Sequence, residues 1–141
     1  MSIPVWAVLA FATWTISILT IGVGVYRWSL ILAGKAELKS FPGDEPHGAP
    51  LYRSFVRAHA NCVENLPVFA AIVLAGEAAH AHSPTLDVLS VAVVAARVVQ
   101  TSAHLSSGSN RAIAVRFTFL CVQLAAFMWM VTLIVLHAAA R

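Results

Sequence analysis

The chain has 141 residues, a length that suits one domain; 60% of them are hydrophobic and only 11% are charged. Ordinary soluble domains carry about 25% charged residues, so this composition excludes a typical soluble protein and predicts a membrane protein. The net charge of +3 does not indicate nucleic-acid binding, because the basic residues form no tract.

The first apolar stretch predicts a membrane-spanning helix from about residue 4 to 32. No charged residue occurs from Val5 to Val25, a run long enough to cross a hydrocarbon core of about 30 Å. The run is too long for a cleavable signal peptide, and no basic region precedes it. Within it, Gly22 and Gly24 can allow a neighbouring helix to approach closely.

A second span is predicted from about residue 51 to 79, after a polar loop over residues 35–50. Arg57, Asn61 and Glu64 fall at i, i+4 and i+7, which is one face of a helix. Such groups in a membrane segment must face another helix or a water-filled cavity, and this favours a functional site. The alternative is a structural ion pair that fixes helix packing.

Two more spans are predicted, from about residue 84 to 105 and from about 111 to 137. The first carries a polar stripe of Arg97, Gln100 and His104, and the second has Arg111 and Arg116 in its first two turns. Four apolar spans with short links predict an all-α up-down bundle formed by one domain over residues 1–141.

No metal site is expected from this sequence. His80 and His82 lie in the second loop without a third ligand nearby, and we interpret them as polar interfacial residues. Cys62 and Cys121 lie within apolar stretches in no metal-binding pattern, so both are expected to be small hydrophobic side chains.

The basic residues indicate how the chain crosses the membrane. They cluster around the first and third loops, so the positive-inside rule places residues 35–50 and 106–110 in the cytoplasm and both termini outside. This topology brings five arginines to one depth, with Glu64 as the acid within the spans. The arginines are Arg53, Arg57, Arg97, Arg111 and Arg116. Partly buried cations in this excess call for an anionic ligand with a carboxylate, thiolate or phosphate.

Residues 57–67, which read Arg-Ala-His-Ala-Asn-Cys-Val-Glu-Asn-Leu-Pro, resemble the helix-2 signature of the MAPEG family, the membrane-associated proteins in eicosanoid and glutathione metabolism. The resemblance extends over nearly the whole chain. It implies a homotrimer of four-helix subunits that binds glutathione between neighbours, with lipophilic substrates and membrane lipids as its other partners.

The resemblance also implies roles for individual residues. Arg57, Asn61 and Glu64 would contact glutathione, and the helix-3 arginine of the family would fall on Arg97. Residues one to two turns later, Gln100 and His104, would complete the site. Arg53, a cation of the same layer, is expected to join it on grounds of charge and depth rather than of the resemblance. An arginine early in the fourth helix activates the thiol in catalytic members, and Arg116 and Arg111 are both candidates here.

The sequence departs from the pattern of the prostaglandin-synthase-like members. The position before the motif's asparagine is Ala60 where some of these members have a second arginine, and Glu37 lies about where a basic ligand of the first helix is found. His104, Phe117 and Phe119 occupy the region that holds tyrosines in such members. These differences argue against the specific eicosanoid activities and leave glutathione binding as the expectation.

We therefore expect a membrane-bound glutathione transferase or peroxidase that activates the thiol for attack on a lipophilic electrophile or hydroperoxide. Three alternatives stay open. One is a non-catalytic lipid-binding or scaffold member of the same family. Another is a small transporter that depends on Glu64, the one deep carboxylate, and the last is a haem protein with His59 and His104 as ligands.

Overall fold

The computed structural model describes residues 1–41, 48–106 and 109–140, and every regular element in this part of the chain is helical. The first span consists of α1 (Ile3–Ser17), a π-helical segment η1 (Ile18–Gly24) and α2 (Val25–Leu32), and a 3-10 turn, η2 (Leu38–Ser40), follows it. The other spans are α3 (Pro50–Ala78), α4 (Pro84–Ser106) and α5 (Asn110–Ala139). These four spans are long and apolar enough to cross a membrane, and their ends lie within two residues of the predicted ranges.

The helices begin where side chains or proline suit an N-terminus. Ser2 caps α1 by accepting a hydrogen bond from the Val5 amide, and Ser83 accepts one from the Leu86 amide at the start of α4. Ser109 caps α5 by accepting from the Ala112 amide. Proline lies in the first turns of α1 and α3, where its missing N–H group costs nothing.

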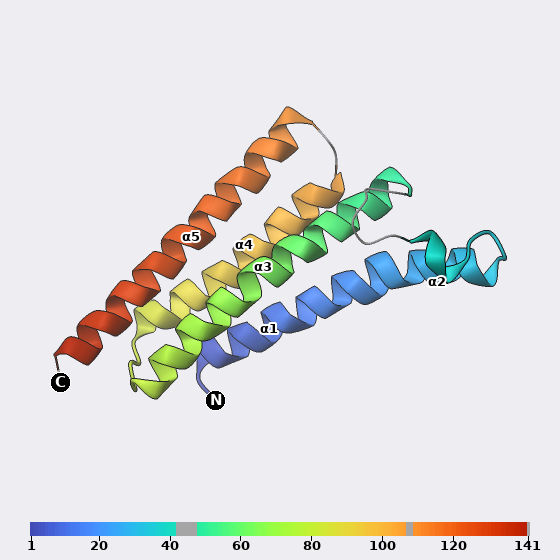
Figure 1. Cartoon of the computed structure of the whole chain (residues 1–141). Helices are drawn as coiled ribbons and strands as arrows, with labels where there is room; N and C mark the ends of the chain where they lie inside the picture. The colour runs from blue at the N-terminus through green and yellow to red at the C-terminus, as the bar shows by residue number, and fades with distance from the viewer. Residues whose placement is uncertain (42–47, 107–108, 141) are drawn as a thin grey trace.

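The helices form an up-down bundle in which α4 contacts α1, α3 and α5. Figure 1 shows both termini and the turn between α3 and α4 at one end, with the other two connections at the opposite end. Three phenylalanines from α1, α3 and α5 meet in the core. The ring centroids of Phe11 and Phe69 are 6.0 Å apart, and those of Phe69 and Phe127 are 5.8 Å apart. This apolar core supports the polar layer described below.

The π-helical segment was not predicted from the sequence. It includes Gly22, which lies directly against the ring of Phe55 on α3: a Cβ atom at this glycine would be 2.0 Å from Phe55 Cδ1. The expected close approach is therefore confirmed for Gly22. At Gly24 an added Cβ would meet only the backbone carbonyl of Leu19, at 3.4 Å, so this glycine does not serve a helix contact.

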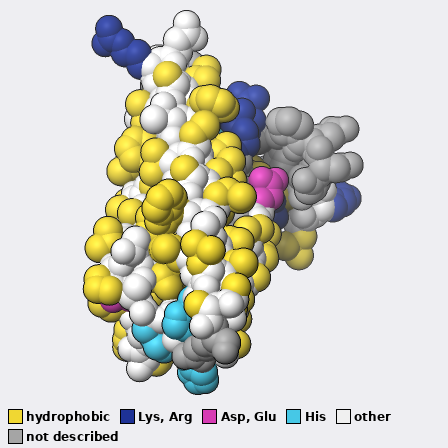
Figure 2. Space-filling view, turned by 90° about the vertical axis from the view of Figure 1, so that its left-hand side faces the viewer, with side chains coloured by type: hydrophobic (Ala, Val, Ile, Leu, Met, Phe, Trp, Pro, Cys, Tyr) yellow, Lys and Arg dark blue, Asp and Glu magenta, His cyan; other side chains and the backbone are white. Residues whose placement is uncertain are grey.

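One face of the molecule shows basic and histidine side chains at different heights. In Figure 2 the lysine and arginine side chains lie toward the upper part of the visible face and the histidines toward its lower end, with a broad hydrophobic surface between them. Many large apolar side chains on the four spans are exposed in the single chain, which suits contact with lipid.

Candidate functional site

The candidate site is a polar layer in the half of the bundle that leads to the first and third connections. His104 on α4 lies close enough to Arg57 of α3, Arg97 of α4 and Arg116 of α5 for all three charges to act on its ring. Three of the predicted arginines, one from each of three helices, thus lie within electrostatic reach of one imidazole. Asn61 joins the layer through its contact with Arg97.

Arg97 is the most deeply buried charged group in this layer. Its side chain is 1% exposed, it donates through Nη1 to Asn61 Oδ1, and its guanidinium lies 5.1 Å from the ring centroid of Phe11. Its Nε and Nη2 atoms are buried without hydrogen-bond partners in the described chain. The one carboxylate among the described residues that acts on the Arg97 guanidinium is that of Glu64, which does so without a direct contact. The positive charge of Arg97 is therefore incompletely balanced in this part of the chain.

Asn61 is held in a single orientation by two donors. Its Oδ1 atom accepts from Arg97 and, at 3.2 Å, from Nδ2 of Asn65, and Asn65 Nδ2 also donates to the Asn61 carbonyl oxygen at 2.8 Å. Because the oxygen is the atom that faces these donors, the Asn61 NH₂ group is directed elsewhere. The half-buried Asn61 can therefore donate hydrogen bonds to an anion at the open side of the layer.

Arg116 and His104 form the contact between α5 and α4 at this depth. Arg116 Nη1 lies 3.2 Å from Nδ1 of His104. A guanidinium can only donate, so Nδ1 must accept, and the ring proton belongs to Nε2. His104 is thus a neutral imidazole with one N–H donor to offer, next to a cation that is permanently charged.

Gln100, which the family resemblance places in the glutathione site, makes its contacts inside the bundle. Its side chain is 2% exposed and lies between α4 and α5, where Nε2 donates to the Arg116 carbonyl oxygen at 3.0 Å and Oε1 accepts from Gln123 at 3.1 Å. Both polar ends of this side chain are therefore used inside the bundle. Gln123 is fully buried and was not among the predicted site residues. The signal that could have found it is an amide alone within an apolar span.

The remaining predicted residues lie at the edge of the layer. Arg57 and Glu64 are exposed on the surface of the single chain, on the same helix as the half-buried Asn61. Arg53 and Arg111 are exposed near the first turns of α3 and α5. The site is therefore open on one side in a single subunit.

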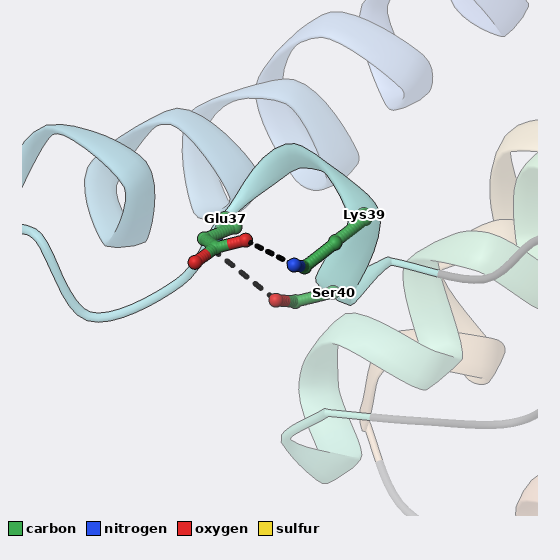
Figure 3. A network of polar contacts seen from close by, with 3 residues as sticks. All are labelled: Glu37, Lys39 and Ser40. Atoms are coloured by element: carbon green, nitrogen blue, oxygen red, sulfur yellow. Dashed lines mark hydrogen bonds and ion pairs between the residues drawn. The ribbon is translucent and has the colours of Figure 1, made fainter.

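Aromatic and basic side chains join α2 to the start of α3, on either side of the first connection. The rings of Tyr26 and Tyr52 stack with centroids 4.5 Å apart, and Arg27 Nε donates to the Tyr52 hydroxyl at 2.7 Å. Further along, Glu37 pairs with Lys39 at 2.8 Å and joins Ser40 in a capping box, as Figure 3 shows. Glu37 is thus engaged with its own loop.

A small cavity lies at the other end of the bundle, away from the arginines. Its lining includes Pro4, Gly76 and Glu77, and the hydroxyl of Ser2 donates to the Glu77 carboxylate nearby. The polar layer and this cavity are therefore separate features of the molecule.

The chain belongs to the MAPEG family: the model of that family matches residues 3–136, nearly the whole chain. Membership agrees with the four-helix membrane bundle described above and makes this an integral, multi-pass membrane protein. It fits roles in glutathione or eicosanoid metabolism, in a family that includes glutathione transferases and peroxidases as well as non-catalytic members. A search of curated proteins found no match.

Proposed function

We propose that this protein is a membrane-bound glutathione transferase or peroxidase. The observation that carries the proposal is the contact of the Arg116 guanidinium with His104, in a layer that also holds the buried Arg97 bound to Asn61. The charges of Arg57 and Arg97 also act on the His104 ring. Glutathione supplies two carboxylates and a thiol that can ionise, which is the kind of ligand that such a layer would stabilise.

The arrangement suggests separate tasks for the two sides of the layer. Arg57 is exposed, and the contacts of Asn61 use its oxygen and leave its NH₂ group free to donate, so both suit the carboxylates and amides of the peptide. The exposed Glu64 suits its ammonium group. Arg116 and the Nε2–H group of His104 suit the sulfur. A free cysteine thiol has a pKa of about 8.5, and adjacent positive charge lowers it, which raises the fraction of nucleophilic thiolate at neutral pH.

The chemistry follows from the thiolate. In a transfer reaction the sulfur forms a bond to carbon of the electrophile, whose leaving group departs with the bonding electrons, and the thiol proton is released to solvent. In a peroxidase reaction two glutathione molecules are oxidised to the disulfide while a hydroperoxide is reduced to alcohol and water. Lipophilic acceptors would reach the site from the bilayer.

The open side of the layer supports a homotrimer as part of the same proposal. Arg57 and Glu64 are charged, lie in a membrane span and are exposed in the single chain, a costly arrangement against lipid. A neighbouring subunit that covers this side would complete the binding site. Membership of a family that generally forms trimers supports the same conclusion.

The test is glutathione binding to the detergent-purified protein by calorimetry, followed by thiolate absorbance in the ultraviolet. We expect binding in the wild type, a loss of about tenfold or more in Arg57→Ala, and absence of the thiolate signal in Arg116→Ala with glutathione still bound. Turnover with an aryl halide and with a lipid hydroperoxide then separates transferase from peroxidase activity.

Two other results have clear meanings. Binding with a thiolate but without turnover of either acceptor class would favour a non-catalytic member of the family. No binding at millimolar glutathione would overturn the proposal and would indicate that the arginine layer binds a different anion.

A further inference from the structure

The two glutamines of the chain, Gln100 and Gln123, contact each other across α4 and α5. Gln100 is 2% exposed and Gln123 is fully buried, within spans that are otherwise largely apolar. Burying an amide in such surroundings costs free energy unless it is hydrogen-bonded. The hydrogen-bond partners of the two glutamines therefore indicate the role of the pair.

The bonds form a chain that ends on the backbone of Arg116. Gln123 Nε2 donates to Gln100 Oε1 at 3.1 Å and to the Phe119 carbonyl oxygen, one turn back in its own helix, at 2.9 Å. Gln100 Nε2 then donates to the Arg116 carbonyl oxygen at 3.0 Å. Reversing either amide would set oxygen against oxygen, so the orientation of the pair is fixed by its partners.

Gln100 and His104 hold the same arginine at two points. They lie one turn apart on α4, and the first binds the Arg116 backbone while the second accepts from its guanidinium. Between membrane helices apolar packing alone sets the axial position weakly, because lipid is as apolar as the side chains, and hydrogen bonds supply the directional contacts.

We propose that Gln100 and Gln123 are positioning residues that set α5 against α4 so that the Arg116 guanidinium meets His104. They act through Arg116 and do not bind the ligand themselves. Only the catalytic consequence of this positioning role rests on the proposed function, because the Arg116–His104 contact exists without any ligand.

The first experiment measures that contact directly. Protein labelled with ¹⁵N-histidine is prepared in detergent, and the His104 signals are identified with His104→Gln. In the wild type we expect Nδ1 to show the shift of an unprotonated, hydrogen-bonded nitrogen, and Arg116→Ala gives the reference for its loss.

The informative variant is the double substitution Gln100→Met/Gln123→Met. Methionine has a similar length and packs well in cores, and changing both residues leaves no unpaired amide, so the melting temperature is expected to stay near that of the wild type. The His104 signal should nevertheless move toward the Arg116→Ala reference. Should the double variant not fold, Gln100→Met alone removes the bond to the Arg116 carbonyl and allows the same comparison.

A matched control is Thr132→Val, which removes an exposed hydroxyl that bonds only within α5, to the Met128 carbonyl oxygen. It should leave the His104 signal unchanged. A wild-type His104 signal in the folded glutamine variants would overturn the positioning role, whether or not these variants bind glutathione.

The second experiment tests the catalytic consequence. In the double variant glutathione should bind within about twofold of the wild type, while thiolate formation moves to higher pH. A shift of about one pH unit would lower the ratio of thiolate to thiol at a given pH about tenfold. A loss of binding with an unchanged pH midpoint would instead mean that Gln100 contacts the ligand. If the wild type binds no glutathione, the proposed function fails, and the NMR result still decides the positioning role.

Discussion

Arg97 on α4 donates to the side-chain oxygen of Asn61 on α3, and this bond joins a fully buried cation to the middle of the helix-2 motif. The other polar atoms of the guanidinium, Nε and Nη2, find no partner among the described residues. Asn61 is therefore a support for Arg97 as well as a candidate ligand of glutathione.

This relationship predicts an unusual order of stabilities. Asn61→Leu should lower the free energy of unfolding by about 1.5–3 kcal/mol, because it leaves the buried guanidinium without its acceptor. Arg97→Met/Asn61→Leu should be more stable than Asn61→Leu, because replacing both partners by apolar groups removes the unpaired charge. Unfolding in detergent, followed by circular dichroism, measures both. A double variant that is less stable than the single one would contradict this account of Arg97.

The contact of Gly22 with Phe55 predicts that the π-helical segment tolerates no side chain at this position. Gly22→Ala should destabilise the protein by about 1–3 kcal/mol, because its Cβ would overlap the Phe55 ring. Gly24→Ala is the matched control and should be close to neutral, since its Cβ meets only one carbonyl oxygen. Thermal unfolding of the two variants in the same detergent gives the comparison. Equal effects of the two substitutions would show that the ring moves away at little cost.

The positions of Arg111 and Arg116 predict which of them activates the thiol. Arg116 contacts His104, whereas Arg111 is exposed in the first turn of α5. Arg116→Ala should lower turnover of the aryl halide at neutral pH by about 100-fold or more, as the loss of one preorganised donor does in other enzymes. Arg111→Ala should stay within about twofold. A greater loss in Arg111→Ala would assign the activating role to Arg111.

The membrane orientation is a prediction from charge that chemical labelling can test. In a background without Cys62 and Cys121, Lys39→Cys should be protected from a membrane-impermeant thiol reagent added to intact cells, and His82→Cys should be labelled. Both positions are exposed, Lys39 in η2 and His82 in the turn between α3 and α4. Figure 1 shows these two segments at opposite ends of the bundle. Labelling of Lys39→Cys without labelling of His82→Cys would show that the orientation is the opposite of the predicted one. Permeabilised cells provide the control, because both cysteines should then react.

Much of the fold could be predicted from the sequence. The four spans follow from uninterrupted apolar runs, and the described helices end within two residues of the predicted positions. The π-helical turns from Ile18 to Gly24 could not be predicted in this way. Their apolar pattern does not distinguish them from an α-helix, and the contact of Gly22 with Phe55 depends on another helix.

The sequence by itself determined that the chain spans a membrane four times, because the length of each hydrophobic run can be read from the linear chain. It also determined that Arg57, Arg97 and Arg116 lie in the same half of the bundle, because their positions within the runs fix their depth. The tertiary structure decided which side chains face one another. Helical spacing puts residues on one face but does not say which neighbour that face meets, so only packing could bury Arg97, leave Arg57 exposed and join Gln100 to Gln123.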